Sequence, residues 1–240
     1  MKKTALWLRT FCLLALLWIL SEPTAFAQDH KALRDSLRRA TNEMEYHPQS
    51  VDLRLKKAGI NLMLEEWENA QNEYDYILKR EPNNLAALYF RAYANEKLHR
   101  YNFARLDYES LLAVVPEHFE AQLGLALLNH KDKHYTEAYN QINHLVSLYP
   151  DSAIVYAARA GMEKERKMME PAEYDYGEAI RLDPQNADYR LARAELRIEM
   201  RRFVDAREDL DELVKQGVNH ATLTEYYQRL GKKKKKRKRK

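Results

Sequence analysis

The sequence is poor in two residue types on which many functional sites depend. It has one cysteine, Cys12, and six glycines among its 240 residues. If the N-terminal segment that contains Cys12 is removed, no thiol remains, which excludes disulfides, cysteine-ligated zinc and a thiol nucleophile. Six scattered glycines also argue against a glycine-rich phosphate-binding loop. A low glycine content with 32% charged residues is typical of a helical protein.

The chain also lacks an apolar run long enough to span a bilayer. Its apolar run Phe11–Leu20 has ten residues, whereas a transmembrane helix needs about 20. Lys2, Lys3 and Arg9 lie before or just at the start of this run, and Ala25–Ala27 supplies small residues at the two positions that a signal peptidase reads. This order predicts a secretory signal peptide at 1–27, cleaved after Ala27, and a periplasmic or cell-envelope location. An uncleaved membrane anchor is the alternative.

The net charge of +4 combines two opposite parts. Residues 28–231 carry 28 basic and 35 acidic side chains, whereas every residue of 232–240 is basic. A run of like charges cannot form a core, so we expect 232–240 to be a disordered tail. Such a tail can hold a protein to an anionic envelope surface or bind nucleic acid nonspecifically. It can also remain solvated or fold back on the acidic residues of 205–212. The candidate polyanion-binding residues are Lys232, Lys233, Lys234, Lys235, Lys236, Arg237, Lys238, Arg239 and Lys240.

Proline recurs at a fixed interval along the body of the chain. Five prolines are each 34 residues apart: Pro48, Pro82, Pro116, Pro150 and Pro184. Proline disrupts a helix interior, so each one marks the end of a helix, and the polar residues that follow can cap the next one. A period of 34 residues with helical patterning predicts a repeat array.

Two alanine series keep the same period. The first is Ala58, Ala92, Ala126, Ala160 and Ala194; the second is Ala70, Ala104, Ala138, Ala172 and Ala206. Three residues before each member of the second series stands a large apolar residue: Trp67, Tyr101, Tyr135, Met169 and Phe203. Apolar positions between the prolines follow helical spacing, so each period holds two helices. The alanines mark close helix contacts, where a larger side chain would cost about 1–3 kcal/mol.

This pattern resembles the tetratricopeptide repeat family, and Tyr101, Ala104, Tyr108 and Pro116 show its signature best. The fifth repeat departs from it, with Val218 where proline is due. The resemblance implies an all-α fold: a tetratricopeptide-type α-solenoid of five helix-turn-helix repeats with an N-terminal half-repeat and a C-terminal capping helix. The expected segments are a capping helix in 28–50, repeats at 51–84, 85–118, 119–152, 153–186 and 187–220, and a capping helix at 221–231.

Charged residues also recur in pairs sixteen positions apart. These pairs are Lys57 and Glu73, Arg91 and Asp107, Arg159 and Asp175, and Arg193 and Asp209. In the third repeat both charges are absent together, because Leu125 and Gln141 occupy the two positions. This joint loss predicts four ion pairs between first and second helices, each contributing about 0.3–1 kcal/mol if exposed.

The family resemblance implies that a partner peptide lies on the concave face formed by the first helices. Tyr89, Phe90 and Tyr93 are candidate anchors because aromatic residues dominate interface energetics; packing between repeats is the alternative. Leu55 and Gly59 stand where chaperone-binding members carry basic and amide groups, so that activity is not implied. The candidate partner-binding residues are Tyr89, Phe90, Tyr93, Lys97, Leu123, Leu127 and Lys131.

No catalytic constellation appears in the sequence. His130 and His134 are four residues apart, but zinc usually takes three or four protein ligands, and we expect both histidines at an exposed turn. The sequence therefore predicts a non-enzymatic scaffold that binds a protein or peptide, with no cofactor, metal or small-molecule substrate. The alternative is a nucleic-acid-associated protein whose tail binds the nucleic acid and whose repeats recruit partners.

Overall fold

A computed structural model describes residues 22–231, and the described chain is helical throughout, without strands. The predicted polybasic tail and all but the last six residues of the predicted signal peptide lie outside the described residues. The described chain divides between Pro116 and Glu117 into two compact units. The even 34-residue spacing does not predict this division.

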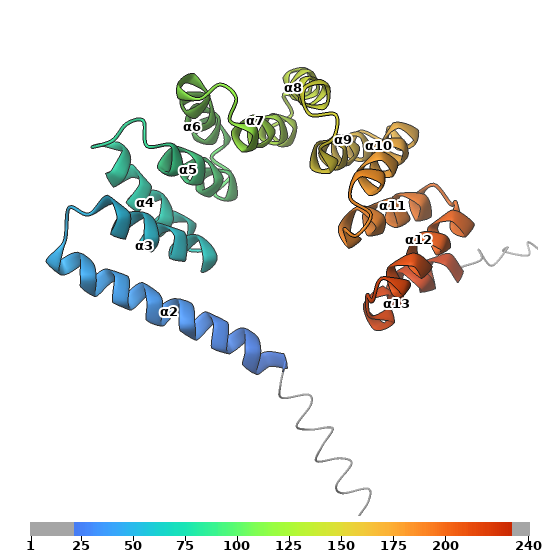
Figure 1. The fold of residues 1–240 in the computed structure, drawn as a ribbon, viewed down its shortest axis with the longest axis horizontal. Helices are drawn as coiled ribbons and strands as arrows, with labels where there is room; N and C mark the ends of the chain where they lie inside the picture. The colour runs from blue at the N-terminus through green and yellow to red at the C-terminus, as the bar shows by residue number, and fades with distance from the viewer. Residues whose placement is uncertain (1–21, 232–240) are drawn as a thin grey trace, which may run out of the picture. The chain divides into compact units, whose positions relative to one another are not determined.

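Unit 1 contains five of the described helices, and consecutive helices pack side by side (Figure 1). They are α2 (Glu22–Tyr46), α3 (Val51–Met63), α4 (Trp67–Leu78), α5 (Leu85–Lys97) and α6 (Tyr101–Val114). Helix α2 begins six residues before the predicted start at Gln28. Leu33, Leu37 and Ala40 on α2 pack against Ile60 and Leu64. These contacts cover the first complete repeat, as predicted for an N-terminal half-repeat.

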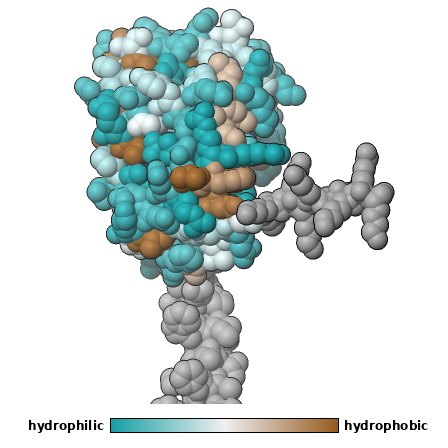
Figure 2. All heavy atoms as spheres, turned by 90° about the vertical axis from the view of Figure 1, so that its right-hand side faces the viewer, coloured by the Kyte–Doolittle hydropathy of each residue, from teal (hydrophilic) through white to brown (hydrophobic). Residues whose placement is uncertain are grey.

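Unit 2 contains the other seven described helices in the same order of pairs. They are α7 (Phe119–Lys131), α8 (Tyr135–Leu148), α9 (Ala153–Glu165), α10 (Met169–Leu182), α11 (Ala187–Glu199), α12 (Phe203–Lys215) and α13 (His220–Gly231). Leu223 of α13 packs with Leu210 and Leu213 of α12. On the side where α11 to α13 lie, hydrophilic side chains predominate (Figure 2). The all-α solenoid fold with a C-terminal capping helix is therefore confirmed.

The residues that predicted the repeats mark the helix ends and helix contacts. Each large apolar residue of the 34-residue series is the first residue of a second helix, from Trp67 in α4 to Phe203 in α12. The prolines follow the ends of α2, α4, α6, α8 and α10. All ten alanines of the two series are completely buried. The prediction that they lie at close helix contacts is confirmed, since a buried alanine lets two helix backbones approach.

All four predicted ion pairs form. The distances are 2.6 Å for Lys57 Nζ–Glu73 Oε1, 2.5 Å for Arg91 Nη2–Asp107 Oδ1, 2.5 Å for Arg159 Nε–Asp175 Oδ2 and 2.6 Å for Arg193 Nη2–Asp209 Oδ1. The expectation for exposed pairs does not apply, because the side chains of Asp107, Asp175 and Asp209 are only 6%, 2% and 3% exposed. Removing the partner of a buried charge costs about 3–5 kcal/mol.

The arginines also join neighbouring repeats. The Nη1 group of Arg91 donates to Asp75 in α4, and that of Arg159 donates to Asn143 in α8. The residue four positions after Arg91, Asn95, donates a further hydrogen bond to Asp107. Each of these arginines therefore links helices from two successive repeats.

The turn from first to second helix has the same unusual backbone in all five repeats. One residue of each turn adopts a positive φ between 58° and 65°, and none of them is glycine. The residues are Glu65, His99, Lys133, Lys167 and Arg201. Glycine adopts this left-handed conformation without a steric penalty, whereas other residues pay for it. The scarcity of glycine in the sequence is thus visible in the structure, because residues other than glycine occupy the left-handed position of all five turns.

Candidate functional site

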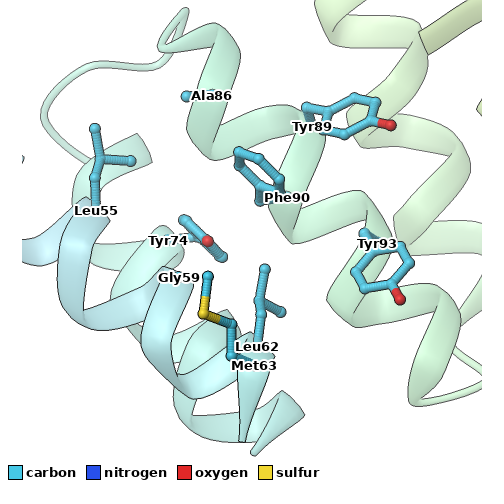
Figure 3. Close-up of a pocket in the computed structure, with 9 residues that line it drawn as sticks. All are labelled: Leu55, Gly59, Leu62, Met63, Tyr74, Ala86, Tyr89, Phe90 and Tyr93. Carbon is cyan, nitrogen blue, oxygen red and sulfur yellow. The ribbon is translucent and has the colours of Figure 1, made fainter. Parts of the chain in front are cut away.

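Unit 1 has an apolar groove between its first helices α3 and α5, floored by α4 (Figure 3). Its volume is about 520 Å³. Gly59 lies beside open space, because a Cβ atom at this position would meet nothing within 4 Å. The lining residues are Leu55, Gly59, Leu62, Met63, Tyr74, Ala86, Tyr89, Phe90 and Tyr93.

Three of the lining side chains are exposed to a degree unusual for their type. Met63 is 68% exposed, Phe90 42% and Tyr93 37%. Placing large apolar side chains together in water is unfavourable by about 25 cal/mol for each Å², and such patches mark interaction sites. The groove is therefore the strongest candidate binding surface in unit 1.

Aromatic contacts hold these rings in place. Phe90 stacks on Tyr74, with ring centroids 6.2 Å apart, and makes an edge contact with Tyr89 at 5.3 Å. Tyr93 makes an edge contact with Trp67 of the preceding repeat at 6.0 Å. The rings thus pack between repeats and also present one side to solvent. Because they are already ordered, a partner that covers them loses little side-chain entropy.

A positive charge lies at the Tyr93 end of the groove. The Nζ atom of Lys97 is 5.1 Å from the Tyr93 ring centroid and 5.8 Å from that of Trp67, so it makes cation–π contacts with both. Lys97 is itself exposed. This end of the groove suits an apolar group that is followed by an acidic one.

The predicted partner-binding residues of unit 2 are placed differently. Leu127 is 40% exposed and Lys131 is exposed. Leu123, in contrast, is only 8% exposed and belongs to the cluster that contains Ile142 and Val155, so the structure does not present it to a partner. Helical spacing places Leu123 on the same helix as Leu127, but it does not show which face the next helix covers.

The two histidines considered as metal ligands do not converge. His130 lies in the last turn of α7 and is buried, not exposed as expected. Its Nδ1 atom is 3.4 Å from Glu165, whereas His134 Nε2 is 3.4 Å from Asp132. Among residues 22–231, no group of three histidine, cysteine or acidic side chains could hold a metal ion. Within the same range, no helix has both the length and the apolar character to cross a membrane.

Comparisons with known proteins identify the fold. Residues 96–153 match the family model of the tetratricopeptide repeat. None of the curated proteins matches the chain.

Several solved structures resemble the chain. A tetratricopeptide repeat protein from Parabacteroides merdae is 23% identical, with a TM-score of 0.71 over 85% of this chain and 79% of that one. A thermophilic tetratricopeptide repeat protein of Thermus thermophilus is 20% identical, with a TM-score of 0.62 over 75% of this chain and 99% of that one. PilF of Pseudomonas aeruginosa is 21% identical, with a TM-score of 0.62 over 76% of this chain and 83% of that one. The chain therefore has the fold of the tetratricopeptide repeat proteins, and its residues 96–153 carry the sequence pattern of that family.

Proposed function

We propose that this protein is an exported, non-enzymatic scaffold that binds a segment of a partner protein in the apolar groove of unit 1. The observation that supports the proposal most is the groove itself, with Phe90 and Tyr93 ordered by packing and still exposed. A scaffold of the tetratricopeptide fold acts through protein–protein contacts, and exposed aromatic side chains in a groove are typical anchors.

The groove favours a particular kind of segment. Its lining is apolar along its length, so the partner contributes apolar side chains that replace water over Met63 and Phe90. The ammonium group of Lys97 lies beside Tyr93 and would pair with a carboxylate that flanks those side chains. Both contacts together select an apolar segment with an acidic end.

The basic tail at 232–240 supplies the second part of the proposal. We propose that it tethers the exported protein to an anionic surface of the cell envelope, with each charge near the surface contributing about 1 kcal/mol at low salt. The alternative remains a nucleic-acid-associated protein bound through the same tail. A mature N-terminus at Gln28 in an envelope fraction supports export, whereas an intact N-terminus in the cytosol contradicts it.

The groove can be tested with two phenylalanines of unit 1. Phe90 lies in the groove, whereas Phe103, which is 63% exposed, lies on α6 and does not line it. The wild type, Phe90→Ala and Phe103→Ala serve as baits for capture from the native host, with quantitative mass spectrometry. We expect a partner that the wild type and Phe103→Ala retain and that Phe90→Ala loses, with affinity reduced about 30-fold for an anchor worth about 2 kcal/mol.

The result is informative only if both variants fold, which circular dichroism checks. A partner retained equally by all three baits at moderate salt would contradict the groove proposal. If every captured protein is lost when the tail residues are replaced by glutamine, the tail carries the binding and the alternative gains support.

A further inference from the structure

The turns of unit 2 differ in charge between the two ends of its helices. The turns from first to second helix, at 132–134, 166–168 and 200–202, contain five basic residues and one acidic residue. The turns between repeats, at 149–152, 183–186 and 216–219, contain no basic residue and two acidic ones. Unit 2 is acidic as a whole, with 15 basic and 21 acidic residues in 117–231. The basic turns therefore do not follow from composition.

Contacts show that these basic turns are neighbours along one edge. The guanidinium of Arg166 lies 4.2 Å over the ring of Tyr135, the first residue of α8. Arg202 forms an ion pair with Glu173 near the start of α10. Each of these turns therefore reaches the start of the second helix in the preceding repeat, directly beside the preceding turn. We call this edge, with Lys133, Arg166, Lys167, Arg201 and Arg202, the basic edge.

Helix α13 ends at the same edge. Lys164 Nζ in α9 lies 2.8 Å from Glu195 Oε2 in α11, and Glu195 Oε1 lies 3.8 Å from Arg229 Nη1 in α13. These pairs join the C-terminal halves of three first-position helices, so the helices end at a common edge. Gly231 is the last residue of α13, and residues 232–240 continue the chain from there. The end of α13, after which the basic residues 232–240 follow in the sequence, therefore lies at the same edge of unit 2 as the basic turns.

Exposed apolar side chains interrupt the basic residues. Met168 follows Lys167 and is 42% exposed. Phe203 and Val204 follow Arg202 and are 37% and 72% exposed. Hydrophobic side chains set among hydrophilic ones also appear on the side of unit 2 where α11 to α13 lie (Figure 2). Basic groups with interspersed apolar groups match the interface of an anionic bilayer, where phosphates lie above acyl chains.

The fold does not require basic residues at these turns. Glu65 and His99 adopt the same left-handed conformation in unit 1 as Lys133, Lys167 and Arg201 do in unit 2. The unit 1 turns at 64–66 and 98–100 contain two acidic residues and one arginine. A net basic charge at these turns is therefore confined to the unit that carries the tail.

We propose that the basic edge is a membrane-contact surface, which binds the phosphate headgroups of an anionic lipid bilayer while Met168, Phe203 and Val204 enter the interface. This deepens the tether of the proposed function and rests on it for the location. Nucleic acid would satisfy the charges and the ring of Phe203 can stack on a base, but the side chains of Met168 and Val204 neither stack on bases nor pair with them. The lipid surface accounts for both kinds of residue.

Acidic residues nearby limit the strength of this contact. Asp132 lies within the first turn, and Glu137, Glu170 and Asp205 lie at the starts of the second helices that follow. Arg202 is already paired with Glu173. We therefore expect the edge to bind weakly by itself and to add to the tail, as stable membrane attachment generally needs two signals.

Vesicle binding of four full-length proteins tests the proposal. The edge variant combines Lys133→Gln, Lys167→Gln and Arg201→Gln, and the tail variant replaces residues 232–240 by glutamine. The control variant combines Arg181→Gln, Arg207→Gln and Lys215→Gln, which removes three exposed charges of unit 2 outside the basic edge. All proteins, including the wild type, keep the same N-terminus, so any contribution of that segment is common to them.

Affinity is measured by co-sedimentation with phosphatidylcholine vesicles that contain or lack phosphatidylglycerol. At about fivefold per charge, we expect the edge variant to bind the anionic vesicles on the order of a hundredfold more weakly than the wild type, and the control only a few-fold more weakly. Equal affinities for the edge and control variants would overturn the proposal. If the tail variant instead binds the vesicles as tightly as the wild type, the tether by the tail is contradicted, whereas the proposal for the basic edge is not.

Two further readouts address the lipid interface. In Val204→Trp, after subtraction of the wild-type spectrum, the emission should shift to the blue on anionic vesicles, since the indole then leaves water. An unshifted spectrum in the bound protein would refute membrane contact at this edge. Tighter wild-type binding to duplex DNA than to anionic vesicles, at equal phosphate concentration, would also overturn the assignment to lipid.

Discussion

Replacing Glu163 by glutamine should stabilise unit 2 above neutral pH and leave its stability nearly unchanged in mild acid. Glu163 lies in α9 and is 7% exposed, and its Oε2 atom is buried without a hydrogen-bond partner. The pKa of this carboxyl is raised to about 7, chiefly by burial and also by the charge of Asp175, while Arg159 opposes the shift. Tyr139 of α8 also faces this charge.

The sign of the effect follows from proton linkage. The pKa of Glu163 is about 7 in the folded chain and about 4.3 in the unfolded chain. At a pH between these two values, the folded chain keeps a proton on this carboxyl that the unfolded chain has released. The free energy of unfolding therefore falls as pH rises, by about 1.4 kcal/mol for each pH unit. The decrease is complete above the folded pKa and amounts to roughly 4 kcal/mol. Glutamine carries no titratable proton, so the free energy of unfolding of Glu163→Gln does not show this decrease.

Urea unfolding followed by far-UV circular dichroism measures the effect between about pH 5 and about pH 8. The difference in unfolding free energy between Glu163→Gln and the wild type should grow by roughly 3 kcal/mol over this range. Glu208→Gln is the control, because Glu208 is exposed in the same unit; its difference from the wild type should stay constant. A difference that does not change with pH for Glu163→Gln would refute the reasoning.

Two further tests of unit 1 use urea unfolding. Arg91→Leu should destabilise unit 1 by about 3–5 kcal/mol, because Asp107 becomes a buried charge without its cation. Adding Asp107→Gln, which leaves Asn95 an acceptor, should recover most of this loss. A double variant no more stable than Arg91→Leu would contradict the account. Glu65→Gly should raise the free energy of unfolding by about 0.5–1 kcal/mol, since glycine relieves the left-handed backbone, and a decrease would show that strain at this turn is negligible.

The repeat period made most of the fold predictable. Helix boundaries follow from Pro82, Trp67 and their equivalents, and the ion pair of Arg91 with Asp107 follows from the joint loss at Leu125 and Gln141. These features are local or recur at a fixed spacing, so a single sequence reveals them. They do not reveal where the chain divides, because the division at Pro116 interrupts none of the series.

The candidate site was predictable only in part. Tyr89, Phe90 and Tyr93 are candidates because of their aromatic type and because the family resemblance implies binding on the face of the first helices; all three line the groove. Whether Leu123 and His130 are buried depends on how the next helix packs, which spacing within one helix does not determine.

The unusual carboxyl at Glu163 has a counterpart in the sequence pattern. The equivalent positions in the first three repeats are Asn61, Asn95 and Asn129, all buried. An acid in such a series indicates a titratable group in a place built for an amide. The structure adds the reason, because Asn129 donates to Gln141 whereas Glu163 faces Asp175.

The left-handed turns have a consequence for how such a solenoid can change. The same backbone accepts an acid at 65, an imidazole at 99 and a base at 133, 167 and 201, while the helix pairs on either side keep their buried alanines. Charge at these turns is therefore decoupled from folding, and each repeat can change the charge of its own turn without disturbing its neighbours. A protein of this kind could be redirected to a different surface by a handful of single substitutions in its turns, with its groove and core left as they are.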